Sequence, residues 1–359
     1  MKHCIVTIIL ATYNRPDTLD AVIKSVINQS LSNWQLFVVG DNCDNRTDNV
    51  IKNNIDSRIK YLNLPDRFGE QSGPNSVGLS LVNTPYVSYL NHDDIWLPDH
   101  LELGINMLKK HDFDFYIGGA AYSRYIDFSE TSSEILVDEF NTADRSPMDL
   151  FARNTAKYEP ASSWIIKHEV AKKIGFWNYY TELYRAPSED YLMRAWRLKY
   201  KFYFSTKVTT WAIVTQYVND TSQMSYEYNS KEHKEVLELV ISNTSDDMRS
   251  ILDRKLYKWN SMTEDEKTII TSHYNILRPN TNVLVKRSNK LMKNLFINKF
   301  TAKIYLVFGL DIFSVVSVLR GKKKGFLINY LIKERTGDVP PKPNLSSVIK
   351  RVQNEVYGN

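Results

Sequence analysis

Two adjacent carboxylates follow an apolar, β-rich run directly, in the segment Asn91-His92-Asp93-Asp94. Carboxylates at a strand end contribute little to packing, but they are the hard oxygen ligands that Mg²⁺ and Mn²⁺ prefer, and such an ion also binds a diphosphate. We therefore expect a divalent-cation site at this turn. The alternative is an exposed turn that caps the helix expected near Pro98, because Asp is common at helix starts.

Polar residues also follow the first two apolar runs of the chain. Thr12-Tyr13-Asn14-Arg15 follows the first run, and Asp41 follows the second. Tyr13 has a ring that can stack on a nucleobase, Arg15 carries a charge suited to phosphate, and Asp41 can accept hydrogen bonds from uracil or ribose. The alternative for each is an ordinary turn or helix cap.

Short apolar runs alternate with helical patterns over the first 120 residues. This rhythm predicts right-handed βαβ units in a mostly parallel sheet. Ligands bind beyond the carboxyl ends of the strands in such sheets, so the three polar segments should converge. Strands are expected at 5–10, 34–39, 59–62 and 86–90, and helices at 17–28, 48–55 and 76–82, with a flexible loop at 69–73.

The remainder of the chain changes character after about residue 220. The middle predicts strands near 115–117, 164–166 and 202–204 and a helix over 189–198, whereas the part from 229 onward is largely helical. Residues 337–343 predict a short linker before a last helix at 346–356. We therefore expect an α/β domain over 1–220 and a mainly helical, basic region over 221–359.

Taken in order, the polar segments resemble those of family 2 glycosyltransferases, which have the GT-A fold. The resemblance covers roughly residues 3–215, and its motifs are specific as a set. It implies a Rossmann-like, mostly parallel mixed sheet flanked by helices. It also implies inverting transfer from a nucleotide-diphosphate sugar, most commonly a UDP-sugar. The matching motifs are Thr12-Tyr13-Asn14-Arg15, Ser25-Val26-Ile27-Asn28-Gln29, Asp41-Asn42-Cys43-Asp44 and Asn91-His92-Asp93-Asp94.

The resemblance also implies roles for individual residues. Asp93 would be the direct Mn²⁺ or Mg²⁺ ligand, because Asn91 stands where the family has its first acid. Asp94 would orient Asp93 or act just behind it. Gly40 replaces the first of two acids often found after the second strand, which leaves Asp41 to contact the base. The residues implied to bind the nucleotide-sugar are Thr12, Tyr13, Asn14, Arg15, Asp41, Asn91 and Asp94.

A Glu-Asp pair at a helix start supplies the general base in the resembling family. Glu189-Asp190 fits that pattern, with Asp190 lying 97 residues after Asp93. By resemblance, Asp190 takes the acceptor proton. Glu189 would hold the acceptor or the local structure. The alternative is that Ser188 caps a helix whose first turn is acidic because the helix dipole favours acids there.

Trp164 and the histidines have less specific patterns. Trp164 lies in a segment that resembles the acceptor side of the family, where it would stack on a sugar ring; the alternative is a core tryptophan. His92 occupies a variable position of the acidic motif, so we expect no role for it. His111, His168 and His233 stand among charged residues and are expected to be solvated.

Composition places the chain among ordinary globular proteins. Its 359 residues are 43% hydrophobic and 24% charged, and its two cysteines do not suggest a disulfide framework, so a reducing cytosol is the simplest compartment. The apolar stretch 304–319 contains Asp311 and is shorter than the roughly 20 residues of a membrane-spanning helix. We therefore expect no transmembrane segment.

Positive charge is concentrated near the C-terminus. Residues 281–359 hold 15 Lys and Arg against 4 Asp and Glu, whereas the rest holds 31 against 37. The basic, aromatic-containing stretch 284–335 is expected either to contact an anionic membrane surface or to pack on the catalytic domain. No recognised nucleic-acid motif accompanies the charge, so we expect no nucleic-acid partner.

These observations favour a cytoplasmic enzyme, peripheral on the inner face of the membrane where the basic region binds it. It would transfer a sugar to a glycan or lipid-linked acceptor in bacterial surface polysaccharide synthesis. One alternative is a nucleotidyltransferase, although residues 11–16 lack the glycine expected in a phosphate loop. The other is a non-catalytic sugar- or nucleotide-binding subunit, which Asn91 makes conceivable. The oligomeric state is left open.

Overall fold

The computed structural model describes residues 4–127, 134–142, 159–183, 186–213, 231–276 and 341–358. Within them, a mixed sheet runs β3-β2-β1-β4-β8-β6-β9-β5, and β7 pairs with β6. The strands are β1 (Val6–Thr12), β2 (Trp34–Gly40), β3 (Ile59–Asn63), β4 (Tyr86–Asn91), β5 (Asp94–Trp96), β6 (Phe115–Asp127), β7 (Glu134–Phe140), β8 (Trp164–Lys167) and β9 (Phe202–Ile213).

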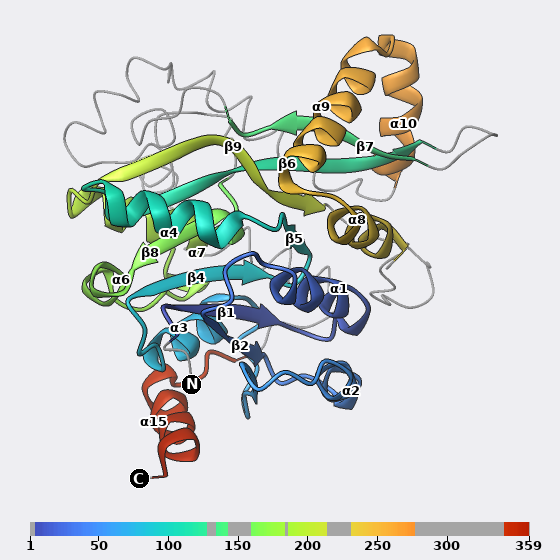
Figure 1. Ribbon diagram of the computed structural model, residues 1–359. Coiled ribbons are helices and arrows are strands. Elements are labelled where there is room, and N and C mark those ends of the chain that lie inside the picture. The colour runs from blue at the N-terminus through green and yellow to red at the C-terminus, as the bar shows by residue number, and fades with distance from the viewer. Residues whose placement is uncertain are drawn as a thin grey trace, which may run out of the picture.

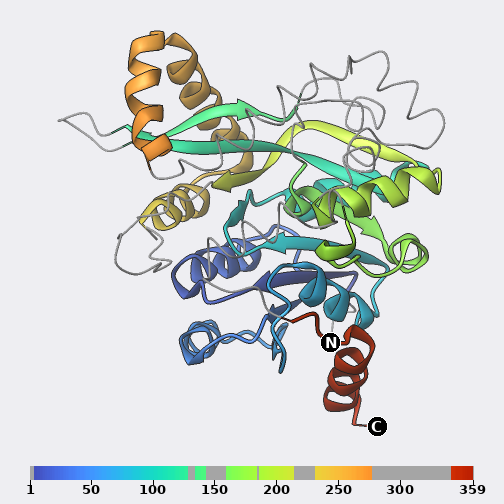
Figure 2. The same ribbon diagram turned by 180° about the vertical axis from the view of Figure 1, so that it is seen from behind.

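Helices cover both faces of this sheet (Figures 1 and 2). Helices α1, α4, α8 and α9 contribute to the apolar cluster on one face, and α3, α6, α7 and α15 to the cluster on the other. The helices are α1 (Pro16–Ile27), α2 (Asn45–Asn53), α3 (Ser72–Ser80), α4 (His100–Lys110), α6 (His168–Ile174), α7 (Pro187–Arg197), α8 (Lys231–Ser242), α9 (Ser245–Ser261), α10 (Glu264–Ile276) and α15 (Leu345–Tyr357).

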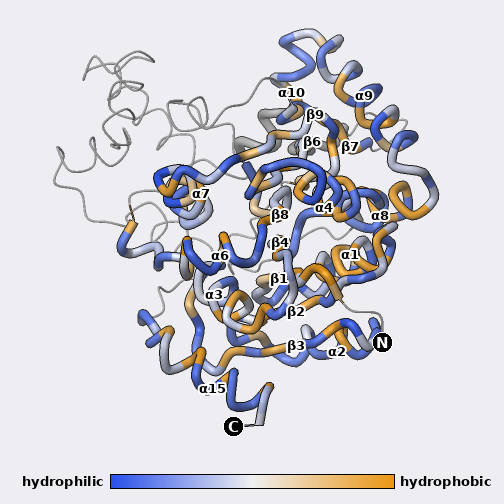
Figure 3. The backbone as a smooth tube through the Cα atoms, turned by 60° about the vertical axis from the view of Figure 1, so that its left-hand side comes forward, coloured by the Kyte–Doolittle hydropathy of each residue, from blue (hydrophilic) through white to orange (hydrophobic). Residues whose placement is uncertain are grey.

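Strand β1 shows why the sheet is covered on both sides. Its side chains alternate between the two faces, and Ile9 joins one cluster while Ile8 and Leu10 join the other. A continuous run of apolar residues is the pattern of a strand buried on both faces. In Figure 3 the hydrophobic residues accordingly gather along β1 and the neighbouring helix α1.

The predicted α/β fold is confirmed, with differences in detail. Strands β3, β2, β1 and β4 are parallel, as expected, but β8 pairs antiparallel with β4 and β6, and β5 pairs antiparallel with β9. The three-residue β5 and the strand β7 were not among the predicted strands, although β7 contains the apolar run Ile135-Leu136-Val137. Helix α3 begins at Ser72, inside the segment 69–73 that was expected to be a loop.

The helices after residue 230 pack on the α/β part of the chain. Helix α8 contacts α1 and β5, α9 contacts β7, and α15 contacts α3 (Figure 1). The expected boundary between 220 and 221, like the basic stretch 284–335 and the apolar stretch 304–319, lies outside the described residues. Within the described ranges, no helix has the length and apolar character needed to cross a membrane.

Candidate active site

The register of three parallel strands brings the predicted polar segments together. Thr12 lies beside Gly40 of β2, and Ala11 lies beside Asn91 of β4. The residues that follow each strand therefore emerge at the same edge of the sheet. This convergence of the segment 12–15, Asp41 and the segment 91–94 agrees with the prediction from the sequence.

The opening loop and the turn after β2 are bonded to each other. Asp41 N donates to Thr12 O at 2.9 Å, and Asp44 N donates to Asn14 Oδ1 at 2.8 Å. Asn14 and Asn42 have φ values of 45° and 60°, in the left-handed region that asparagine tolerates better than most residues. Asn14 thus has an evident structural role, and its predicted contact with the nucleotide stays a prediction.

Asp41 holds the loop that follows β3. Its two carboxylate oxygens accept from Phe68 N and Gly69 N, each at 2.7 Å, and the residue is only 3% exposed. Burial raises the pKa of Asp41 to about 7, against the opposing effect of the two N–H donors and Arg67. The Arg67 guanidinium also lies 4.3 Å from the centre of the Tyr13 ring, which places a cation at the predicted base-stacking residue.

Asn91 and Asp94 form a buried pair behind the acidic turn. Asn91 Nδ2 donates to Asp94 Oδ2 at 2.9 Å, and Ser162 Oγ donates to the same oxygen. Burial, and then the negative charge of Asp93, raise the pKa of Asp94 to about 7. The amide at position 91 therefore supplies a donor where an acid would repel Asp94. This geometry fits the supporting role expected for Asp94.

Asp93 is the less buried of the two acids. Within the described residues, no group of three or more His, Cys, Asp or Glu side chains is arranged to hold a metal. A cation at Asp93 would therefore take most of its ligands from a diphosphate and from water. Mg²⁺ commonly binds in this way, through one or two carboxylates plus substrate phosphates. The residues present fit a cation that binds together with the nucleotide.

His92 joins the acidic turn to the opening loop, although no role was expected for it. Its Nδ1 accepts from Tyr13 N at 3.3 Å, and its Nε2 lies 3.5 Å from Arg15 Nη1. Arg15 is only 5% exposed, so its guanidinium lies within the loop. The expectation that Arg15 faces a phosphate stays a prediction, and in this conformation its evident contact is with His92.

Asp190 is held in place by two donors. Its Oδ2 accepts from Arg194 Nε at 2.9 Å and from Asn178 Nδ2 at 3.1 Å. Arg194 is itself fixed, because Nη1 donates to Ile174 O at 2.6 Å and Nη2 to Phe176 O at 2.9 Å. The carboxylate at the first turn of α7 therefore has a defined orientation.

The start of α7 agrees with one part of the alternative explanation for the acidic pair and contradicts the other, because Glu189 and Asp190 do lie in the first turn of the helix. Ala186 is the N-cap and Pro187 the first helical residue, whereas Ser188 lies inside the helix and is buried. The alternative in which Ser188 caps the helix is therefore wrong in that detail. Glu189 is partly exposed beside Asp190, and its predicted acceptor role stays a prediction.

A stack of aromatic rings connects α7 to β4. Tyr191 lies 5.0 Å from Trp177 and 5.9 Å from Tyr89, measured between ring centres, and Trp164 stacks on Trp177 at 5.9 Å. Tyr89 precedes Asn91 by two residues, so the stack links the Asp190 helix to the acidic turn. Trp164 is fully buried in this stack. Its predicted acceptor contact is therefore wrong, and the core alternative is confirmed.

His233 is the residue whose position the sequence least revealed. It was expected to be solvated, as His111 is, but it is fully buried on α8, and its Nε2 lies 3.0 Å from Asp93 O. Burial lowers the pKa of His233 to about 4, so the ring is neutral. The only sequence feature that could have indicated this burial is the helical spacing of His233 with the buried apolar residues of α8.

Comparison with known proteins gives a family-model match to nearly the first half of the chain. Residues 7–175 match the family model described as Glycosyl transferase family 2. Over 118 residues the chain is 33% identical to the UDP-Glc:alpha-D-GlcNAc-diphosphoundecaprenol beta-1,3-glucosyltransferase WfgD of Escherichia coli, a match that covers 33% of this chain and 46% of WfgD.

A second relative and a solved structure give weaker matches. The poly(ribitol-phosphate) beta-N-acetylglucosaminyltransferase TarP of Staphylococcus aureus is 31% identical over 117 residues, covering 32% of this chain and 36% of TarP. The chain thus spans less than half the length of either relative. The structure of S. aureus TarS 1-349 in complex with UDP-GlcNAc has a TM-score of 0.47 at 15% identity, covering 99% of this chain and 92% of that one.

Proposed function

We propose that this chain, of which residues 7–175 match the glycosyl transferase family 2 model, transfers a sugar from a nucleotide-diphosphate donor to a hydroxyl of a glycan or lipid-linked acceptor. The observation that carries the proposal is the oriented carboxylate of Asp190. It lies on a helix whose aromatic face packs against the strand that carries the Asp93 turn. This arrangement supports a role for Asp190 as the proton acceptor, on a helix that packs against the strand leading to the proposed diphosphate site.

In the proposed reaction, the acceptor oxygen attacks the anomeric carbon from the side opposite the diphosphate. A bond forms between that oxygen and the carbon while the bond to the diphosphate oxygen breaks, which inverts the configuration. The bonding electrons leave with the diphosphate, and Asp190 takes the hydroxyl proton. Within the described residues, both hydrogen bonds to Asp190 reach Oδ2, so Oδ1 is left for that proton.

The donor side is proposed to consist of the opening loop, Asp41 and Asp93. Tyr13, with Arg67 over its ring, would stack on the base. A Mn²⁺ or Mg²⁺ ion held by Asp93 and the diphosphate would neutralise the charge that builds on the leaving group. A UDP-sugar is the proposed donor, since the name of WfgD specifies UDP-Glc. The names of WfgD and TarP also support a role in bacterial surface glycan synthesis.

A panel of nucleotide-sugars tests this proposal. We expect release of a nucleoside diphosphate from one donor, dependent on Mn²⁺ or Mg²⁺ and abolished by a chelator. Release of pyrophosphate instead would identify a nucleotidyltransferase, and nucleotide binding without turnover would identify a binding subunit. Asp112→Asn is the matched control, because the Asp112 side chain is 82% exposed and pairs with Lys201; this variant should keep full activity.

We also propose that the basic stretch 284–335 brings the enzyme to an anionic membrane surface at the cytoplasmic side. The support is its excess of Lys and Arg, each of which contributes about 1 kcal/mol near such a surface. Sedimentation with phosphatidylglycerol vesicles should capture the protein at low salt and release it at high salt. Equal sedimentation with neutral phosphatidylcholine vesicles would contradict the proposal.

A further inference from the structure

Helix α8 presents one buried stripe to the α/β part of the chain. His233, Val236, Leu237 and Val240 are spaced as i, i+3, i+4 and i+7, so they share one helix face. Val236 and Val240 are fully buried and Leu237 nearly so. His233 is the polar member of these four residues and lies nearest the N-terminus of the helix, next to Glu232, which is also buried.

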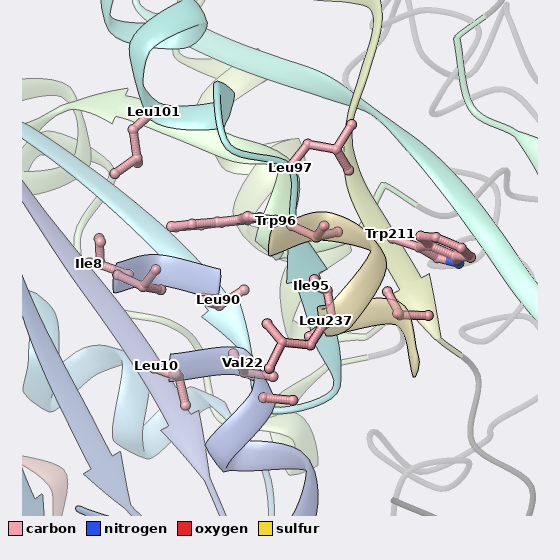
Figure 4. Close-up of a cluster of buried hydrophobic side chains, with 14 of the residues drawn as sticks. Ile8, Leu10, Val22, Leu90, Ile95, Trp96, Leu97, Leu101, Trp211 and Leu237 are labelled. Carbon is pink, nitrogen blue, oxygen red and sulfur yellow. The ribbon is translucent and has the colours of Figure 1, made fainter. Parts of the chain in front are cut away.

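The apolar part of this stripe fixes where the histidine lies. Figure 4 shows Leu237 close to Val22 of α1 and Ile95 of β5, and all three belong to the same buried cluster. Ile95 follows the acidic turn by one residue. The packing of α8 therefore sets the position of the His233 ring relative to that turn.

The hydrogen bond of His233 defines its protonation. A backbone carbonyl only accepts, so Nε2, at 3.0 Å from Asp93 O, must carry the proton and donate. Nδ1 is then an acceptor, and it is buried without a hydrogen-bond partner among the described residues. Burying an unpaired polar atom is unfavourable. The histidine therefore needs a reason to be at this position other than packing.

The acidic turn is held on each side of Asp93. His92 is bonded to Tyr13 N, and Asp94 to Asn91 and Ser162. The backbone carbonyl of Asp93 lies between these contacts in the sequence, and His233 Nε2 donates to it at 3.0 Å. With this bond in place, the peptide plane of Asp93 is fixed and the side chain is the part left to meet a ligand.

We propose that His233 is a positioning residue, which orients the Asp93 turn so that the Asp93 carboxylate faces the nucleotide diphosphate. This role rests on the proposed function, and it extends the donor site to a helix 140 residues further along the chain. The helical region beyond residue 230 would then be required for donor binding and not only for stability. His233 acts through Asp93 and does not touch the donor.

Binding of UDP with Mn²⁺, measured by titration calorimetry, tests the role without depending on the acceptor. His233→Phe fills the space but cannot donate, and we expect it to weaken UDP binding by about 10- to 100-fold, as loss of an orienting partner commonly does. His233→Gln carries an amide donor that can reach the carbonyl, and it should bind UDP within about threefold of the unchanged protein. Val240→Ala perturbs the same stripe away from the turn.

Thermal unfolding of the same variants separates positioning from packing. We expect Val240→Ala to lower the Tm while leaving the Kd for UDP within about twofold, because the loss of two buried methyl groups away from the turn lowers stability without changing the turn. Unchanged UDP binding by His233→Phe would overturn the role, as would a loss of binding that follows Tm in all three variants. If His233→Phe does not fold, UDP binding by His233→Gln is compared with UDP binding by His233→Asn. We expect only His233→Gln to bind UDP as the unchanged protein does, because the shorter asparagine amide does not reach the carbonyl.

The two proposals fail in different ways. If the unchanged protein binds no nucleoside diphosphate with either metal, the proposed function falls and the role of His233 falls with it. If the unchanged protein binds UDP and His233→Phe binds it equally, only the role of His233 falls.

Discussion

Replacing Asn91 with aspartate gives a sharp test of the buried pair behind the acidic turn. The change restores the acid that the resembling family has at this position, so a view based on the motif alone expects tighter metal binding. The structure predicts damage instead. Asn91 Nδ2 donates to Asp94 Oδ2 at 2.9 Å, and Asp94 is only 4% exposed. Asn91→Asp removes that donor and places two carboxylates in contact.

The size of the effect follows from the geometry. Two unit charges about 3 Å apart repel by about 5 kcal/mol at an effective dielectric constant of about 20. The pair can escape this repulsion by keeping one proton, as other carboxylate pairs do. At pH 6 a shared proton replaces the amide donor, and we expect the free energy of unfolding to fall by about 1 kcal/mol or less. At pH 8.5 we expect a loss of about 2–4 kcal/mol.

The pH dependence has a defined sign. An acid whose pKa is raised in the folded state binds more protons there, so stability falls as pH rises from the unfolded pKa to the folded one. In the unchanged protein this window runs from 3.8 to about 7 for Asp94. The second acid raises the folded pKa of the pair further. The difference between Asn91→Asp and the unchanged protein should therefore widen above pH 7.

Urea unfolding at pH 6.0, 7.0 and 8.5, in metal-free buffer, measures this difference. Asn106→Asp is a suitable control, because Asn106 is an exposed residue of α4 and the change should alter stability by less than about 0.5 kcal/mol at each pH. The reasoning is refuted if Asn91→Asp is as stable as the control at pH 8.5, or if its stability rises with pH relative to the unchanged protein.

Three further predictions concern other parts of the structure. Arg194→Lys should lower the rate of sugar transfer by about 10- to 100-fold while leaving the Kd for UDP unchanged, because Asp190 loses its fixed orientation. An equal loss in UDP binding would contradict a role for Arg194 in orienting Asp190. Trp164→Ala should lower the free energy of unfolding in urea by about 3–5 kcal/mol, as expected for a fully buried ring. The milder variant Trp164→Phe should keep the KM for the acceptor, and a raised acceptor KM would show that Trp164 contacts the sugar after all. Ile349→Ala should lower the free energy of unfolding by about 2–4 kcal/mol, because α15 packs on α3. The control Ile269→Ala, at a position 61% exposed, should change that free energy little. Equal effects of the two changes would show that α15 does not belong to the core.

The parts of the fold that follow local pattern were predictable from sequence. β-branched runs located β1 and β2, and the parallel register then required their polar ends to meet. Strand β5 is three residues long and forms only by pairing with β9, so it has no local signal. The antiparallel placement of β8 likewise depends on contacts distant in the sequence.

The candidate site shows the same division. Asp93 was predicted from its place after a strand and Asp190 from the family resemblance, and the structure places both at the ends of regular elements. The donor function of Asn91 toward Asp94 could not be inferred, because it depends on Asp94 being buried. His233 appeared to be solvated among charged neighbours, and only the docking of α8 buries it. Trp164 belongs to the core because the rings of Tyr89, Phe115, Trp177 and Tyr191 pack around it.

The central claim is that Asp190 accepts the acceptor proton in sugar transfer. The most direct measurement compares Asp190→Asn with the unchanged protein and with Asp112→Asn, using one active donor and its acceptor in the presence of Mn²⁺. The account predicts that Asp190→Asn binds the donor within about threefold of the unchanged protein yet transfers sugar at least about 100-fold more slowly, as loss of a general base does. Transfer by Asp190→Asn at the rate of Asp112→Asn would contradict the account.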